Sequence, residues 1–273
     1  MVICHLGLLT WMASTQSPAW QEPAQLAAGL SWWSFGRSDM VRVSGPLPPC
    51  IAGLAVLPFD PVVDPDHFDR PPQGRDEHAR AAELVRDNAN RARLYFILAR
   101  LACIPFSVLG AYGCWHLAKA LFGAPSALMA LTLWCSCPYV LGFAAINTTD
   151  AHAAAIGLTA VACYWSWLRS PEWLRAMVAG VMLGLAVLSK LTLILFYPLL
   201  PVLWVAYRFP QENGTSRRAW LRQAAMLATL LLVSVHVVNC GYLFEGTFTP
   251  LGKYRFRTTI LSGCRPLADV PPE

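Results

Sequence analysis

The chain has 273 residues, of which 56% are hydrophobic and only 14% are charged. Soluble domains carry about a quarter charged residues, and the mean hydropathy here is +0.44, so the composition excludes an ordinary water-soluble globule. It also excludes a disordered chain, a coiled coil and a disulfide-framework domain. The net charge of +5 does not indicate nucleic-acid binding, because the arginines lie in short loops between apolar runs instead of lining one face.

Apolar runs separated by single charges predict an all-α, polytopic membrane bundle of about seven helices. As one helix, Ala176–Tyr207 would be about 48 Å long, too long for a bilayer, so Ser189-Lys190 is predicted to be the tip of a hairpin of two short spans. The shortness of the first span is accounted for if the true start of the protein lies upstream. The predicted spans are Val2–Met12, Leu94–Phe122, Ala124–Ile146, Ala151–Leu168, the two halves of Ala176–Tyr207, and Trp220–Leu243.

The spans divide the chain into four segments: a shortened first span at 1–13, an outer loop at 14–92, the membrane bundle at 93–243 and an outer tail at 244–273. Basic residues mark alternate ends of the spans, which places those ends in the cytoplasm by the positive-inside rule. Asn147–Asp150 and Lys190 then face outward. The basic residues are Lys119, Arg169, Arg175, Arg208, Arg217, Arg218 and Arg222.

The outer loop itself is patterned. Pro23–Phe35 and Leu47–Phe59 are too short to cross a bilayer and are typical of interfacial helices. The charged stretch Asp60–Arg93 is typical of solvated surface.

Polar residues at membrane depth are costly and therefore serve as functional hypotheses. Four such features are predicted to meet on the outer face: Gln21-Glu22, Arg37–Arg42, Asp150 and Lys190. Each has a structural alternative. Asp150 suits a helix cap, Lys190 could snorkel to headgroups, and Glu22 could be a first-turn acid before Pro23.

Several short motifs, in this order, resemble the GT-C class of integral membrane glycosyltransferases, and most closely family 39. That family includes protein O-mannosyltransferases and lipid A aminoarabinose transferases. The resemblance runs from about Trp20 to Val205. Its motifs are the acidic residue after the first span, Ser44-Gly45-Pro46-Leu47-Pro48-Pro49, Leu98-Ala99-Arg100-Leu101, Thr148-Thr149-Asp150, and the run from Gly184 to Thr192.

The resemblance implies an enzyme that moves a sugar from a polyprenyl phosphate carrier to an acceptor on the outer face by inverting displacement. Such a reaction needs a carboxylate to receive a proton and a cation to stabilise the leaving phosphate. Glu22 and Asp150 are accordingly the predicted catalytic residues. Lys190, Arg42 and Gln21 are the predicted substrate-binding residues, with Lys190 as the phosphate contact.

The sequence also departs from the family pattern. The usual acidic pair after the first span is Asp-Glu, whereas Gln21 is an amide that cannot act as a base. The chain also ends soon after its seventh predicted span, so we expect it to be truncated at its C-terminus. A non-catalytic membrane protein of the same fold is therefore the alternative function. A small transporter is a third, disfavoured because charges are rare within the spans and no repeat is visible.

The expected partners are a polyprenyl phosphate-linked sugar, the lipid bilayer and an acceptor that the sequence does not identify; nucleic acid is not expected. No protein metal site is predicted, although Asp150 and Glu22 could hold a divalent cation together with donor oxygens. The expected location is the bacterial inner membrane, with the active face outward.

Overall fold

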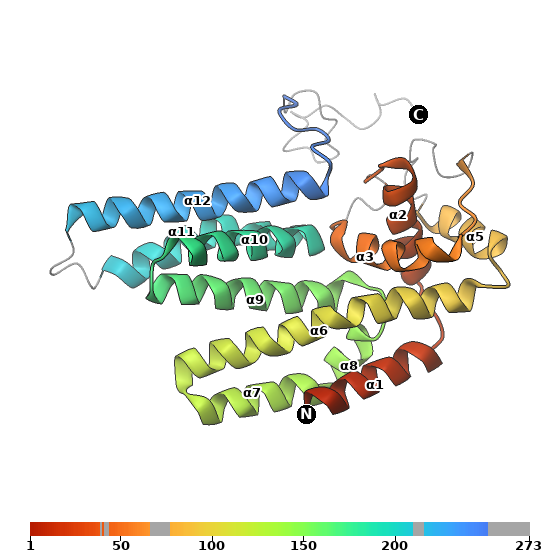
Figure 1. Ribbon diagram of the computed structural model, residues 1–273, viewed down its shortest axis with the longest axis horizontal. Coiled ribbons are helices and arrows are strands. Elements are labelled where there is room, and N and C mark those ends of the chain that lie inside the picture. The colour runs from red at the N-terminus through yellow and green to blue at the C-terminus, as the bar shows by residue number, and fades with distance from the viewer. Residues whose placement is uncertain (39, 41–43, 66–76, 210–215, 251–273) are drawn as a thin grey trace, which may run out of the picture.

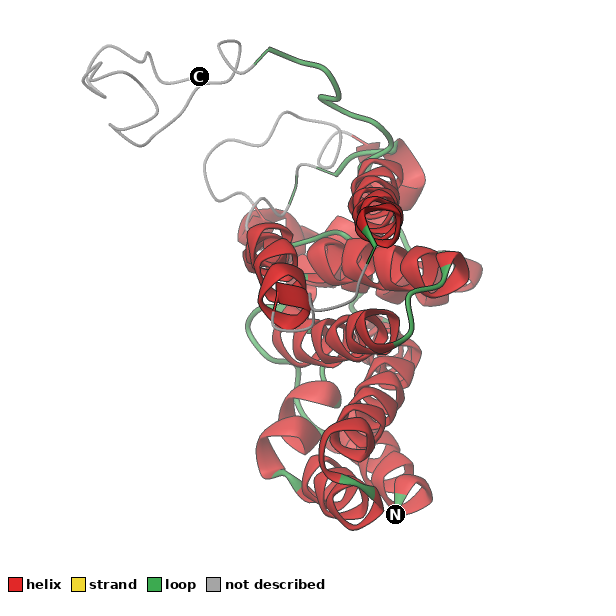
Figure 2. Cartoon of the chain, turned by 90° about the vertical axis from the view of Figure 1, so that its left-hand side faces the viewer, coloured by secondary structure: helices red, strands yellow, loops and turns green. Residues whose placement is uncertain are grey.

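The computed structural model describes residues 1–38, 40, 44–65, 77–209 and 216–250, and these fold entirely into helices and connecting loops (Figures 1 and 2). The predicted fold class, an all-helical bundle suited to a membrane, is confirmed. The elements are α1 (Val2–Thr15), α2 (Glu22–Phe35), α3 (Leu47–Val56), η1 (Leu57–Phe59), α5 (Glu77–Asp87), α6 (Ala92–Phe122), α7 (Ala124–Ser136), α8 (Pro138–Ala144), α9 (Thr149–Arg169), α10 (Trp173–Ser189), η2 (Leu191–Leu195), α11 (Phe196–Arg208) and α12 (Arg217–Gly241).

Helix α9 is the centre of the bundle and packs between α6 and α10 (Figure 1). Its small side chains allow this close packing: the side chain of Thr159 lies against Gly113 of α6, and Ala155 lies against Gly110. Toward its C-terminal end, Tyr164 and Trp167 belong to an apolar core that α10, α11 and α12 complete. Helix α9 is therefore shielded on several sides by its neighbours.

By length and composition, three helical segments of the described chain could cross a membrane: α6, the η2–α11 segment and α12. The pair α7 and α8 adds a fourth if it is one span broken at Cys137, where the two helices meet at 54°. Helices α1 and α10 are apolar but shorter. Helix α9 has 21 residues but is not among the candidate spans. The count of about seven spans stays a prediction.

The predicted hairpin after Ala176 is present, because α10 ends at Ser189 and the chain reverses through η2 into α11. As a result, the helix ends that carry basic residues lie together at one end of the bundle. This end is on the left in Figure 1 and faces the viewer in Figure 2. There Arg169 donates a hydrogen bond to the carbonyl of Ala120, and Arg208 donates one to the carbonyl of Leu168. We refer to it as the arginine end.

Helices α2, α3 and α5 gather at the opposite end, and α2 runs across the direction of the bundle (Figure 1). Helices α2 and α3 touch through glycines: a Cβ built on Gly29 would lie 1.9 Å from the carbonyl oxygen of Pro49. Helix α5 falls in the stretch predicted to be solvated surface. That prediction is wrong for α5, which buries Ala81 and Leu84 because its apolar residues share one face against α2.

Candidate active site

Asp150 and Lys190 form an ion pair at the end of the bundle opposite the arginine end. The ammonium of Lys190 lies 2.5 Å from Oδ1 of Asp150, and the two side chains are 37% and 39% exposed. Asp150 is in the first turn of α9 and Lys190 directly follows α10, so antiparallel packing of these helices joins residues 40 positions apart. The pair is half-open to the surroundings and therefore accessible to a ligand.

The first loop crosses the end of α10 beside this pair. A Cβ built on Gly45 would lie 1.9 Å from the carbonyl oxygen of Leu188, so only glycine permits this approach. Ser44, next to it, accepts a hydrogen bond from the Gln25 amide of α2 at 3.4 Å. The loop thus links α2 to the residues that immediately precede Lys190.

A small hollow of about 10 Å³ lies where this loop meets α2 and α3, lined among others by Trp32, Met40, Gly45 and Cys50. Burial raises the pKa of the Cys50 thiol to about 12, so this thiol stays protonated at neutral pH. A protonated thiol is neither a nucleophile nor a metal ligand. The hollow has room for no more than about one water molecule.

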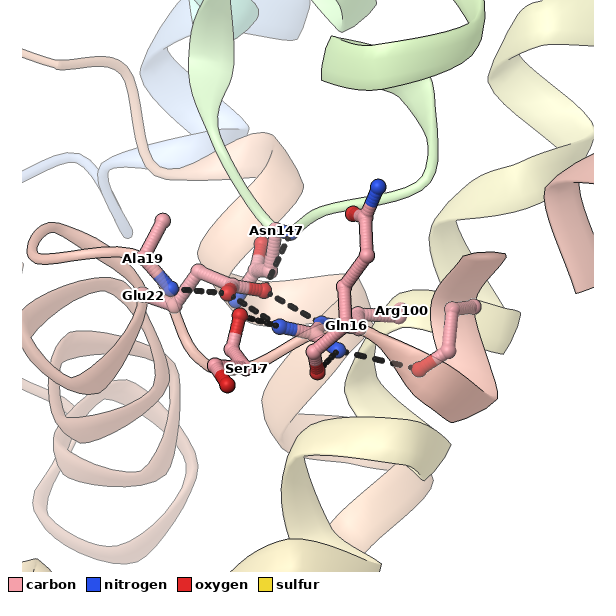
Figure 3. A network of polar contacts seen from close by, with 7 residues as sticks. Gln16, Ser17, Ala19, Glu22, Arg100 and Asn147 are labelled. Carbon is pink, nitrogen blue, oxygen red and sulfur yellow. Dashed lines mark hydrogen bonds and ion pairs between the residues drawn. The ribbon is translucent and has the colours of Figure 1, made fainter. Parts of the chain in front are cut away.

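Glu22, the other predicted acid, lies in a fully buried ion pair with Arg100 of α6 (Figure 3). Oε1 of Glu22 accepts from Nε of Arg100 and from the backbone N–H of Asn147, both at 2.8 Å. Oε2 accepts from Nη2 of Arg100 at 2.6 Å and from the backbone N–H of Ala19 at 2.7 Å. Four donors on two oxygens fill the acceptor capacity of a carboxylate.

The Arg100 guanidinium is equally saturated. Its remaining N–H groups donate to the backbone carbonyls of Ala13, Gln16 and Ser17, so all five donors have partners. The network connects the end of α1, the start of α2, α6 and the turn before α9 (Figure 3). Sequence analysis singled out Arg100 only as part of a motif; its isolation in a long apolar run was the signal of a buried partner.

The structure brings some of the predicted site residues together and keeps others apart. Among the residues it describes, Glu22 has no hydrogen bond or ion pair with Asp150 or Lys190, although the Asn147–Asp150 segment connects the two groups. Gln21 is exposed at the start of α2 and its side chain does not cap the helix. Arg42 lies outside the described residues.

Several buried polar atoms near the start of α9 lack a hydrogen-bond partner: Nδ2 of Asn147, Oγ1 of Thr148 and both ring nitrogens of His152. The His152 ring lies 5.2 Å from the ring of Phe106, centre to centre, and is fully buried. Sequence analysis did not select His152. Buried polar groups of this kind are usually satisfied by ordered water or a ligand.

The described part of the chain contains no cluster of side chains that could bind a metal ion by itself. No three His, Cys, Asp or Glu side chains there are grouped closely enough to hold an ion. Both carboxylate oxygens of Glu22 already accept hydrogen bonds, two of them from Arg100, so Glu22 is not available as a second ligand beside Asp150.

An all-helical bundle with membrane-length apolar helices, and with charged groups paired at one end, defines an integral membrane protein. Residues 96–239, more than half of the chain, match the dolichyl-phosphate-mannose-protein mannosyltransferase family, and the chain belongs to that family. It is thereby a GT-C-like membrane glycosyltransferase, as the resemblance in its motifs predicts. No curated protein and no solved structure matches the chain.

Proposed function

We propose that the chain transfers a sugar from a polyprenyl phosphate carrier to an acceptor, at the membrane surface beside Asp150 and Lys190. The observation that carries the proposal is the half-exposed Asp150–Lys190 pair in a family of lipid-linked sugar transferases. A lipid-borne donor explains why reactive groups stand at the end of the bundle, where the carrier phosphate would lie at headgroup depth.

The chemistry requires two groups of opposite charge. An acceptor oxygen attacks the anomeric carbon, the bond from that carbon to the phosphate oxygen breaks, and the phosphate leaves with the electron pair. Asp150 would receive the acceptor proton, and Lys190 would stabilise the leaving phosphate. Binding of the phosphate to Lys190 would also release the Asp150 carboxylate from its present ion pair and make it available as a base.

The other predicted residues take supporting parts in this proposal. Gln21, exposed at the start of α2, would contact the donor or the acceptor, and Arg42 stays a predicted substrate contact. Glu22 would become a base only if its four present hydrogen bonds were broken, so the proposal assigns the proton to Asp150. The arginine end would face the cytoplasm and the Asp150 end would face outward.

Donor binding by purified variants tests the role of Lys190. Replacing Lys190 with Ala should weaken binding of the polyprenyl phosphate sugar about 10-fold to 150-fold, as expected for loss of a charge-assisted contact. Lys190→Arg should retain most of the binding, because it keeps the positive charge. The matched control is Arg217→Ala, which removes one exposed charge at the arginine end. Equal binding by Lys190→Ala and Arg217→Ala would contradict the proposal.

A non-catalytic member of the family is the second candidate. One observation and one expectation favour it: Arg100 binds the Glu22 carboxylate, and Gln21 is an amide where the resemblance leads us to expect an aspartate. This candidate predicts donor binding that depends on Lys190 but no sugar transfer. The two candidates are separated by measuring binding and transfer on the same preparation.

A further inference from the structure

A second pocket lies at the arginine end, far from Asp150 and Lys190 along the bundle. It has a volume of about 540 Å³ and lies between the loop that precedes α10 and the start of α12. Its lining combines the charged side chains of Arg218 and Arg222 with Gln223 and with apolar side chains of Pro171, Ala219 and Met226. Nothing in the proposed transfer reaction uses this pocket.

The lining residues of α12 have an amphiphilic order. Arg218, Arg222 and Met226 are four residues apart and therefore lie on one face of the helix, over a length of about 12 Å. Arg218 and Arg222 are exposed, whereas Met226 is fully buried. Arg218 and Arg222 therefore form the open, charged part of the pocket, and its accessible apolar lining is Ala219 and Pro171, which are partly exposed.

The two guanidinium groups have no acidic partner among the residues that the structure describes. The carboxylate nearest in sequence to the pocket lining, Glu172, faces Arg175 instead, at 3.4 Å. None of the residues that line the pocket is acidic. The pocket is therefore electropositive and suited to an anion.

Aromatic residues cluster beside the pocket, as they do in membrane proteins at the interface between hydrocarbon and headgroups. Trp204 of α11 packs edge-on against Trp220 of α12 with ring centres 5.2 Å apart, and Trp165 packs against Tyr207 at 5.4 Å. Trp204 also donates a hydrogen bond to Gln223, one of the lining residues. Indole and phenol rings concentrate where hydrocarbon meets headgroups.

We propose that this pocket binds the headgroup of an anionic phospholipid from the leaflet at the arginine end. The phosphate would lie between Arg218 and Arg222, because guanidinium groups bind phosphate oxygens in bidentate fashion. The first methylene groups of the acyl chains would cover Ala219 and Pro171, which are partly exposed. A free phosphate would satisfy the arginines but leave the side chains of Ala219 and Pro171 uncovered, so the lipid is the favoured ligand.

Native mass spectrometry of the full chain in a nonionic detergent tests the proposal. A nonionic detergent has no negative surface potential, so basic residues are not attracted to it in general. Dioleoyl phosphatidylglycerol is titrated against dioleoyl phosphatidylcholine at about 0.15 M ionic strength, where charges more than about 8 Å apart are largely screened. We expect the protein to retain one phosphatidylglycerol molecule in preference to phosphatidylcholine. Arg218→Ala or Arg222→Ala should weaken its binding about tenfold, and Arg218→Lys should weaken it less.

Arg217→Ala is the matched control. Arg217 is exposed and lies in the same helical turn as Arg218, but it does not line the pocket. It should change binding by less than about twofold, since its charge makes no direct contact. Equal losses for Arg217→Ala and Arg218→Ala, or no preference for phosphatidylglycerol, would overturn the proposal. Displacement by inorganic phosphate at the lipid's own concentration would overturn it too, since the pocket would then take a small anion. These readouts do not depend on sugar transfer.

Discussion

The Glu22–Arg100 pair is fully buried, and every polar atom of both groups has a partner. Moving two charges out of water is costly, and good geometry with complete hydrogen bonding is what offsets that cost. The net stabilisation by the attraction between the two charges is therefore small. The loss of stability when one partner is removed is large, because the other charge is then buried without a partner. It fixes the start of α2, and with it the first loop, relative to α6 and the turn before α9.

Arg100→Met should destabilise the protein by about 3–5 kcal/mol, because it leaves the Glu22 carboxylate buried without a counter-charge. Three backbone carbonyls, one in the last turn of α1 and two in the connection to α2, would also lose this donor. The free energy of unfolding in detergent measures this loss. Adding Glu22→Gln to Arg100→Met should recover part of it, since the buried charge is then removed.

Arg175→Ala provides the comparison for this prediction. Arg175 pairs with Glu172 at 3.4 Å, but the side chains are 41% and 59% exposed. Exposed pairs contribute about 0–1 kcal/mol, so this variant should be nearly as stable as the parent. If Arg100→Met were as mild as Arg175→Ala, the buried network would have no structural role.

At the residue scale, sequence patterns revealed isolated charges but not their partners. Lys190 is selected because it stands alone in an apolar run, and Asp150 because it opens a span on the same predicted side. Their contact follows from the antiparallel packing of α9 and α10. Glu22 and Arg100 are 78 residues apart. Their pairing depends on how α1 and α2 are placed against α6, which neither local pattern nor spacing determines. No local sequence pattern distinguishes His152 from other residues of an apolar helix, so its burial without a hydrogen-bond partner is visible only in the structure.

Among the elements, α10 and α12 come together through small residues. A Cβ built on Gly184 would lie 2.6 Å from Cβ of Val237 and 2.9 Å from the carbonyl oxygen of Ser234. Close approach of this kind replaces the hydrophobic driving force that helices lack inside a bilayer. Since α10 ends at Ser189, directly before Lys190, its packing against α12 also supports the candidate site.

Gly184→Ala should destabilise the bundle by about 1–3 kcal/mol, because the added methyl group forces α10 and α12 apart. Gly7→Ala in α1 is the control, since a Cβ there meets nothing within 4 Å. It should be neutral or stabilising by up to about 1 kcal/mol, because alanine favours helix over glycine. Thermal unfolding in one detergent compares the two, and a change of the same sign for both would refute the packing argument.

Helix positions were largely predictable, because apolar length and charged breaks are local signals. The hairpin at Ser189-Lys190 and the existence of helix α2 followed from them; that α2 is interfacial stays a prediction. The break between α7 and α8 was missed, although Pro138 begins α8 and a proline favours the first turn of a helix. Helix α5 was missed because its charged face dominated the composition, while its apolar face becomes meaningful only when α2 is present to cover it.

On the scale of the whole molecule, the bundle has two chemically different ends. The arginine end holds Arg169, Arg208 and the pocket lined by Arg218 and Arg222, whereas the Asp150–Lys190 pair is at the opposite end, toward which α2 and α3 also lie. A bilayer orients such a molecule, because basic loops are retained on the cytoplasmic side. In the proposed orientation the candidate site faces outward, at the depth of a lipid carrier's phosphate.

The most direct measurement is transfer of labelled sugar from a polyprenyl phosphate donor in proteoliposomes that contain the full chain, supplied with a membrane extract as the source of acceptor. The account predicts transfer by the parent chain and by Arg217→Ala. Asp150→Asn should lower the rate about 10²-fold to 10⁴-fold, the range for loss of a general base, while donor binding is retained. Full transfer by Asp150→Asn, or donor binding by the parent chain without any transfer, would contradict the account.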